Sequence, residues 1–170
     1  MGREIRRVPP NWQHPKKMFA SGMDYVSMHD QTFEQACATW DEGKRKWDAG
    51  EDPDRKQYDH ENDPYEDWAG ERPDDPEYYR PWKDEEATWF QLWQTVSEGS
   101  PVSPPFATLE ELAQHLAKHG DDWDQQRGNA PWGIERARRF CKSGWAPSFV
   151  AIGGALYDGT NIPALPKDDT

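Results

Sequence analysis

Residues 84–97, with the sequence DEEATWFQLWQTVS, place three large aromatic rings within five positions, and the predicted fold is built outward from them. Asp84 suits the N-cap position of a helix, and the acids at positions 85 and 86 complement the positive end of its dipole. The larger apolar residues recur at the spacing of one helical face: Trp89, Leu92, Trp93 and Val96. Phe90 falls on another side, so we expect a helix at the centre of the fold that is buried on more than one face.

Three more helices are predicted from their capping signals. The first covers residues 32–48 and begins at the capping box Thr32-x-x-Gln35. The second follows another capping box, Thr108-x-x-Glu111, and ends at Gly120. The third lies near residues 133–143 and ends at Gly144.

The other segments carry too many prolines or glycines for long helices. Three prolines between positions 9 and 15 indicate that residues 1–30 follow an extended path. Residues 50–83 contain five prolines and many aromatic rings, so we expect an acidic Pro-rich loop that its rings hold in place, with one short turn near residues 64–69. The glycine-flanked apolar stretch at 145–157 predicts one short strand or a hairpin.

The composition indicates that the core is aromatic rather than aliphatic. The mean hydropathy is −1.16, yet the chain contains 10 Trp, 6 Tyr and 6 Phe. Each large aromatic side chain buries roughly 150–250 Å², so a few of them replace many aliphatic residues. We therefore expect a mainly α fold of about four helices, with α+β as the alternative. It would form a single domain over residues 1–162, and residues 163–170 would be a flexible tail.

The charge excludes some classes of partner. A net charge of −12 argues against direct nucleic-acid binding, which needs a basic footprint, and against an anionic membrane surface. It favours a partner with a basic surface. The sequence contains neither an apolar run long enough to span a membrane nor the hydrophobic region of a signal peptide, so we expect a soluble cytoplasmic protein. Cys37 and Cys141 are interpreted as buried, reduced thiols.

The sequence contains no recognisable catalytic centre. His115 and His119 lie four residues apart on a predicted helix, a spacing that lets two imidazoles share a cation. The intervening residues lack the Glu of the His-Glu-x-x-His motif, and no third ligand follows at a motif-like spacing. We therefore expect no metal, no cofactor and no enzymatic activity.

The strongest regional signal is the acidity of residues 41–87, where 18 acids stand against eight Lys or Arg. One interpretation is a solvated acidic loop. The other is a binding surface that competes with nucleic acid for a basic channel on another protein. On the second interpretation the partner-binding residues are seven acids and two aromatic anchors: Glu51, Asp52, Asp54, Glu61, Asp63, Glu66, Asp67, Tyr65 and Trp68.

Four strings in the chain resemble a group of small uncharacterised proteins encoded by tailed bacteriophages and prophages. They are RRVPPNWQHP at 6–15, YRPW at 79–82, TVSEGSPVSP at 95–104 and GWAPS at 144–148. The resemblance spans nearly the whole chain and implies a phage origin and action inside an infected bacterium. It implies no activity and no catalytic residue.

These observations favour a phage accessory protein that works by stoichiometric binding. Its predicted target is a host defence nucleoprotein complex with a basic surface, of the CRISPR or restriction type, in the cytoplasm of the infected bacterial host. The first alternative is a structural protein of the virion or of its assembly. The second alternative is a metal-dependent enzyme centred on His115 and His119. The sequence does not indicate the oligomeric state.

Overall fold

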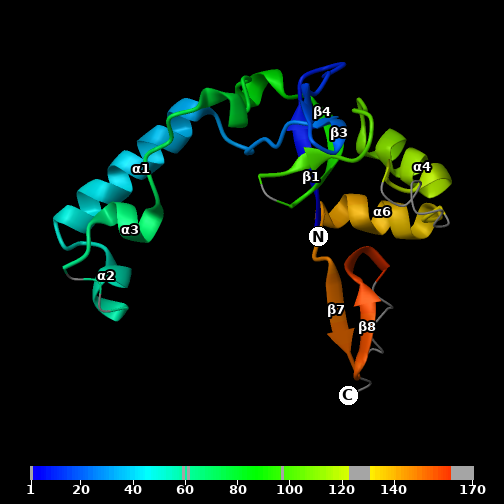
Figure 1. Ribbon diagram of the computed structural model, residues 1–170. Helices are drawn as coiled ribbons and strands as arrows, with labels where there is room; N and C mark the ends of the chain where they lie inside the picture. The colour runs from blue at the N-terminus through cyan, green and yellow to red at the C-terminus, as the bar shows by residue number, and fades with distance from the viewer. Residues whose placement is uncertain (1, 59, 61, 97, 123–130, 162–170) are drawn as a thin grey trace. The chain divides into compact units, whose positions relative to one another are not determined.

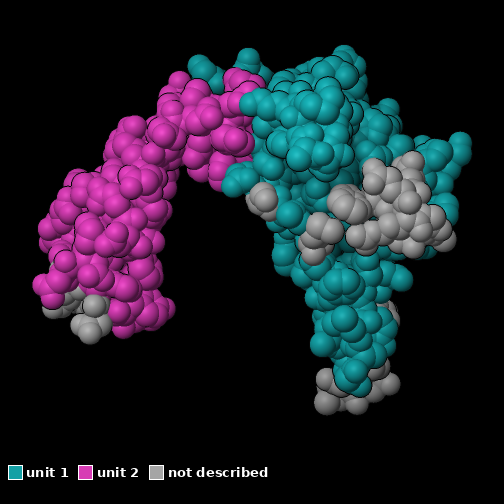
Figure 2. All heavy atoms as spheres, in the orientation of Figure 1, with its two compact units in different colours: residues 1–27, 82–170 teal, residues 28–81 magenta. Residues whose placement is uncertain are grey.

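The computed structural model describes residues 2–58, 60, 62–96, 98–122 and 131–161 (Figure 1). The chain divides into two compact units: residues 1–27 with 82–170 form unit 1, and residues 28–81 form unit 2 (Figure 2). The single domain over residues 1–162 stays a prediction, because two compact units can still fold cooperatively as one domain. The predicted tail at 163–170 lies outside the described residues.

Unit 1 is built on a four-stranded antiparallel sheet with the strand order β5-β4-β1-β6. The two central strands, β1 (Arg3–Val8) and β4 (Trp89–Gln94), pair from one end to the other, with Ile5 opposite Leu92. At the edges, β5 (Ser100–Pro101) pairs with β4, and β6 (Trp145–Ala146) pairs with β1.

The predicted mainly α fold is therefore wrong, and the protein is α+β. The stretch predicted as a central helix forms one 3₁₀ turn, Asp84–Glu86, and then strand β4. The neighbours Leu92 and Trp93 are both fully buried because they point to opposite faces of a sheet that is covered on both sides. A strand buried on both faces does not show the alternation of apolar and polar residues that marks a half-exposed strand. Here the larger apolar residues happen to recur at the spacing of a helical face.

Two helices cover one face of this sheet. α4 (Leu109–His119) and α6 (Ile134–Ser143) pack against each other, and the predicted capping box at Thr108 and Glu111 and the predicted stop at Gly144 are confirmed. The core between helices and sheet consists of buried residues from both layers: Leu92, Val102, Leu112, Ala113, Leu116, Trp132, Ala137, Phe140, Cys141 and Ala146.

The opposite face of the sheet is covered by aromatic and charged groups. The Arg6 guanidinium lies 4.5 Å from the ring centre of Trp93, and the His14 ring lies 4.8 Å from the same Trp. Burial, reinforced by the charge of Arg6, lowers the pKa of His14, although its hydrogen bond with the Val26 carbonyl opposes the shift. Arg6 can thus be buried because its guanidinium contacts the Trp93 ring and the Glu4 carboxylate.

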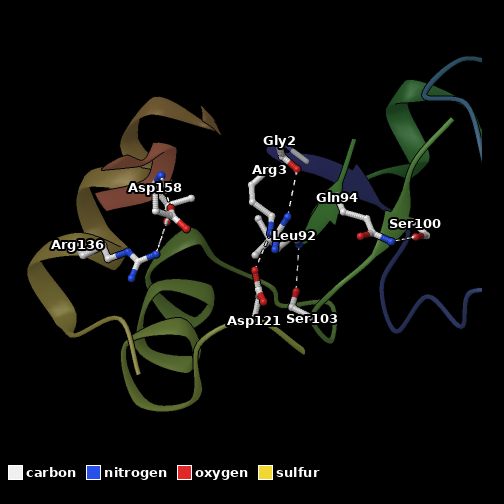
Figure 3. A network of polar contacts seen from close by, with 10 residues as sticks. Gly2, Arg3, Leu92, Gln94, Ser100, Ser103, Asp121, Arg136 and Asp158 are labelled. Carbon is white, nitrogen blue, oxygen red and sulfur yellow. Dashed lines mark hydrogen bonds and ion pairs between the residues drawn. The ribbon is translucent and has the colours of Figure 1, made fainter. Parts of the chain in front are cut away.

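Polar contacts connect the two central strands to other segments of unit 1 (Figure 3). Arg3 on β1 donates to Asp121, just beyond α4, over 2.6 Å, and only 1% of the Asp121 side chain is exposed. The Leu92 amide donates to the Ser103 hydroxyl over 3.0 Å. These bonds satisfy groups that burial would otherwise leave without water.

Two hairpins complete unit 1. β2 (Lys16–Phe19) pairs with β3 (Gly22–Tyr25), and β7 (Phe149–Ile152) pairs with β8 (Ala155–Asp158) before the 3₁₀ turn Gly159–Asn161. The prediction for residues 145–157 was one short strand or a hairpin; a hairpin forms over residues 149–158, and residues 145–146 form strand β6 of the sheet instead. The N-terminal segment is extended as expected, but the sequence did not indicate that it supplies a central strand and a hairpin.

Unit 2 is helical, and its first helix was predicted. α1 (Phe33–Asp48) begins at the capping box formed by Thr32 and Gln35. α2 (Pro53–Gln57), α3 (Tyr65–Ala69) and the 3₁₀ turn Pro76–Tyr78 follow in the Pro-rich segment, where α3 is the expected short turn. In the described part of the chain, no helix is long and apolar enough to cross a membrane.

We expect Asp121→Asn to lower the free energy of unfolding by about 3 kcal/mol, because it leaves the Arg3 guanidinium buried without its counter-charge. Chemical denaturation followed by Trp fluorescence measures the change. The control Glu85→Gln removes an exposed charge and should change the free energy by less than about 0.5 kcal/mol. Equal stability of the two variants would contradict the structural role of the ion pair.

Candidate functional site

The acidity of the chain is concentrated in unit 2. Its 54 residues contain 17 Asp or Glu and seven Lys or Arg, a net charge of −10, whereas the rest of the chain carries −2. The charge therefore belongs to one compact unit and is not spread over the whole surface. An electrostatic partner would be attracted to this unit first.

Unit 2 is organised around Trp47, near the C-terminal end of α1. Only 1% of Trp47 is exposed, and its indole nitrogen donates to the Asp63 carbonyl over 2.9 Å. Arg55 on α2 lies over the ring at 5.7 Å and donates to the Trp47 carbonyl over 2.6 Å. A single Trp thus fastens α2 and the segment before α3 to α1.

Tyr65 on α3 is a packing residue. Its ring lies 5.3 Å from Trp40 and 5.7 Å from Trp47, and its hydroxyl lies directly over Gly43, where a Cβ atom would collide with it. Burial, with a smaller effect of Asp52, raises the pKa of Tyr65. The glycine inside α1 is therefore the site at which α3 docks.

An aromatic stack runs from this interior to the surface. The Trp68 ring lies 5.9 Å from Trp47 with an interplanar angle of 22°, and the Tyr58 ring lies 5.7 Å from Trp68 at 23°. Trp68 is 41% exposed and Tyr58 is 53% exposed. We call these two residues the exposed aromatic pair. Offset stacking of this kind holds their rings in a fixed position at the surface.

Several of the acids already have basic partners within unit 2. Glu51 pairs with Arg45, Glu66 with Lys44, and Asp63 with His60. The side-chain hydrogen bond from Arg45 also lowers the pKa of Glu42 to about 2. These surface pairs order the side chains locally and leave the large excess of negative charge in place.

The remaining predicted partner-binding residues lie on or beside the short helices. Asp52 accepts a hydrogen bond from the Asp54 amide at the start of α2, and Asp67 is exposed in the first turn of α3. Glu61 lies outside the described residues. Tyr58 was missed, because nothing in its local sequence indicates that its ring stacks on Trp68. The binding role of all of these residues stays a prediction.

The histidine pair of α4 lies at the end of that helix, where a shared cation was considered. The rings of His115 and His119 lie 5.1 Å apart, and burial, with a smaller effect of His119, lowers the pKa of His115. Among the described residues, no group of three or more His, Cys, Asp or Glu side chains could hold a metal ion. Phe106, 5.0 Å from His115, makes the pair part of an aromatic contact.

A second exposed surface lies on the β7–β8 hairpin of unit 1. Phe149 and Leu156 are exposed there, and residues 143–157 include no charged side chain. This absence of charge is unusual in a chain in which 31% of the residues are charged. The hairpin therefore presents apolar surface, and its one charged residue is Asp158 at the end of β8, which pairs with Arg136.

Comparison with sequence models of protein families, with curated proteins and with solved structures finds no match for this chain. Function is therefore inferred from the charge, the exposed rings and the strand edges described above.

We expect Gly43→Ala to destabilise unit 2 by about 1–3 kcal/mol, because the new methyl group displaces Tyr65. This effect opposes the stabilisation of about 1 kcal/mol that Ala normally brings to a helix interior. Near-UV circular dichroism during thermal unfolding measures the outcome. Adding Tyr65→Phe, which removes the colliding hydroxyl, should recover part of the loss. A Gly43→Ala protein more stable than the wild type would contradict this packing.

Proposed function

We propose that this protein acts by stoichiometric binding, with acidic unit 2 as the surface that engages a basic partner. The observation that carries the proposal is the segregation of charge, since a net −10 lies in 54 residues. Clustered charge of one sign accelerates encounter with the opposite sign and disfavours partners of like sign. Direct binding to nucleic acid is disfavoured for the same reason.

The partner class that we propose is a host defence nucleoprotein complex whose basic nucleic-acid channel unit 2 would occupy. Two arguments support it. Basic channels that bind phosphate backbones also attract clustered carboxylates by the same Coulomb and counterion effects. The phage-like strings in the sequence favour action in the cytoplasm of an infected bacterium, where such complexes are targets. Inhibition would then be competitive with the nucleic acid.

A virion or assembly protein is the second candidate function, and the β7–β8 hairpin favours it. Exposed strand edges with few charged residues pair readily with strands of other chains. In this candidate function, the hairpin contacts further copies or other particle proteins, and unit 2 keeps the assembly soluble.

The first candidate predicts that charge reversal in unit 2 abolishes capture of the partner. Asp67, Glu71 and Asp74 are exposed and lie outside the ion pairs described above. Changing all three to Lys moves the net charge of unit 2 from −10 to −4, and we expect partner affinity to fall at least about tenfold. Tagged protein recovered from infected cells, washed at low and high salt, measures the loss.

The matched control reverses three exposed acids of unit 1: Asp24, Glu85 and Glu135. Its overall charge change is identical, so retained binding by the control assigns the effect to unit 2. Equal recovery of partner by the unit 2 variant and the wild type would contradict the proposal.

The second candidate predicts self-association that depends on the hairpin. Analytical ultracentrifugation at rising concentration should show oligomers that Ala151→Lys on β7 abolishes, because a Lys blocks strand pairing at an edge. A wild-type protein that stays monomeric and is absent from purified particles would remove this candidate.

A further inference from the structure

We infer that the exposed aromatic pair, Tyr58 and Trp68, is a recognition site for an arginine side chain of the partner. This inference rests on the proposed function, because it names the group that acidic unit 2 would bind. It is carried by the geometry of the stack: two rings lie nearly parallel and remain about half exposed at the end of a column that begins in the core.

The rings are held rigidly enough to receive a planar ligand. Trp68 stacks on Trp47, and Trp47 is itself fixed by its bond to the Asp63 carbonyl. The His60 ring lies 5.1 Å from Trp68, and the His60 imidazole is bonded to the Asp63 carboxylate over 2.7 Å. Rigid aromatic anchors bind with little loss of conformational entropy, which is why they are common in binding hot spots.

The charges around the pair specify a cation. Asp54 lies in α2, and Tyr58 follows the last residue of that helix. The Tyr58 amide donates to the Asp54 carbonyl over 3.0 Å, so the two residues are one helical turn apart. The Asp63 carboxylate pairs with His60, whose ring contacts Trp68. Asp67 directly precedes Trp68 on α3. An anionic or purely apolar ligand would be disfavoured against these carboxylates, whereas a cation gains from both the rings and the acids.

Arginine fits better than lysine. Its planar guanidinium stacks on aromatic faces and is weakly hydrated, whereas the lysine ammonium is a compact, strongly hydrated charge. The same chain already uses this contact in its interior: an Arg guanidinium lies over Trp47, over Trp93 and over Trp132, at 5.7, 4.5 and 4.4 Å. Among the described residues no Lys or Arg lies over Trp68 or Tyr58. Trp68 already contacts Trp47, His60 and Tyr58, so the 53% exposed ring of Tyr58 at the end of the stack is the surface offered to a partner's arginine.

The test compares two peptides of equal charge, deca-arginine and deca-lysine, each fluorescently labelled and titrated with the full chain. We expect deca-arginine to bind about two- to fivefold more tightly for each stacked guanidinium. Tyr58→Ala and Trp68→Ala should abolish this preference while leaving the deca-lysine affinity unchanged. Tyr58→Ala preserves the Trp47–Trp68 contact, so it tests the site even if Trp68→Ala unfolds unit 2.

Trp145→Ala is the matched control, because it removes a 56% exposed Trp from unit 1. It should keep the preference for arginine. Equal binding of the two peptides by the wild type, or a preference that survives Tyr58→Ala, would overturn the inference. Different results would contradict the proposed function itself: neither peptide would bind measurably, or both would still bind the unit 2 variant with three acids changed to Lys.

Discussion

The pairing of β1 with β4 is the interaction on which unit 1 depends. Each strand supplies the backbone partners of the other, and each directs alternate side chains into two different layers. Leu92 enters the helix-covered core, whereas its neighbour Trp93 meets Arg6 and His14 on the other face. Because β1 and β4 are far apart in the sequence, the sheet forms only when these two distant segments pair.

The chain contains few aliphatic residues, and unit 2 forms its core from aromatic rings without a sheet. Trp47 fills the space between three short segments, and Tyr65 reaches α1 through the gap left by Gly43. The aromatic stack that starts at buried Trp47 ends at the surface with Trp68 and Tyr58. The result is a small helical unit whose acids and exposed rings are held in place by the same aromatic column. Stability and the proposed recognition therefore share one set of side chains.

The sequence predicts those parts of the fold that depend on local signals. The capping boxes at Thr32 and Thr108, the stop at Gly144 and the short helix at 65–69 depend on neighbouring residues and were found. Strand β4 depends on β1, some 85 residues away, and no local pattern shows that Arg3 pairs with Asp121 or that Arg6 is buried against a Trp ring. Within the candidate site, the acidity followed from the composition, and Tyr65 and Trp68 were predicted alike as anchors. Only tertiary contacts separate them: Tyr65 is packed on Gly43, whereas Trp68 and Tyr58 stack at the surface.

The central claim is that unit 2 carries the binding surface and unit 1 carries the sheet-based core. Hydrogen–deuterium exchange, measured by mass spectrometry with and without deca-arginine, tests it most directly. The account predicts slower exchange in peptides covering residues 51–68 and unchanged exchange in β1, β4, α4 and α6. Protection confined to the β7–β8 hairpin or to the sheet of unit 1, with no change across residues 51–68, would contradict it.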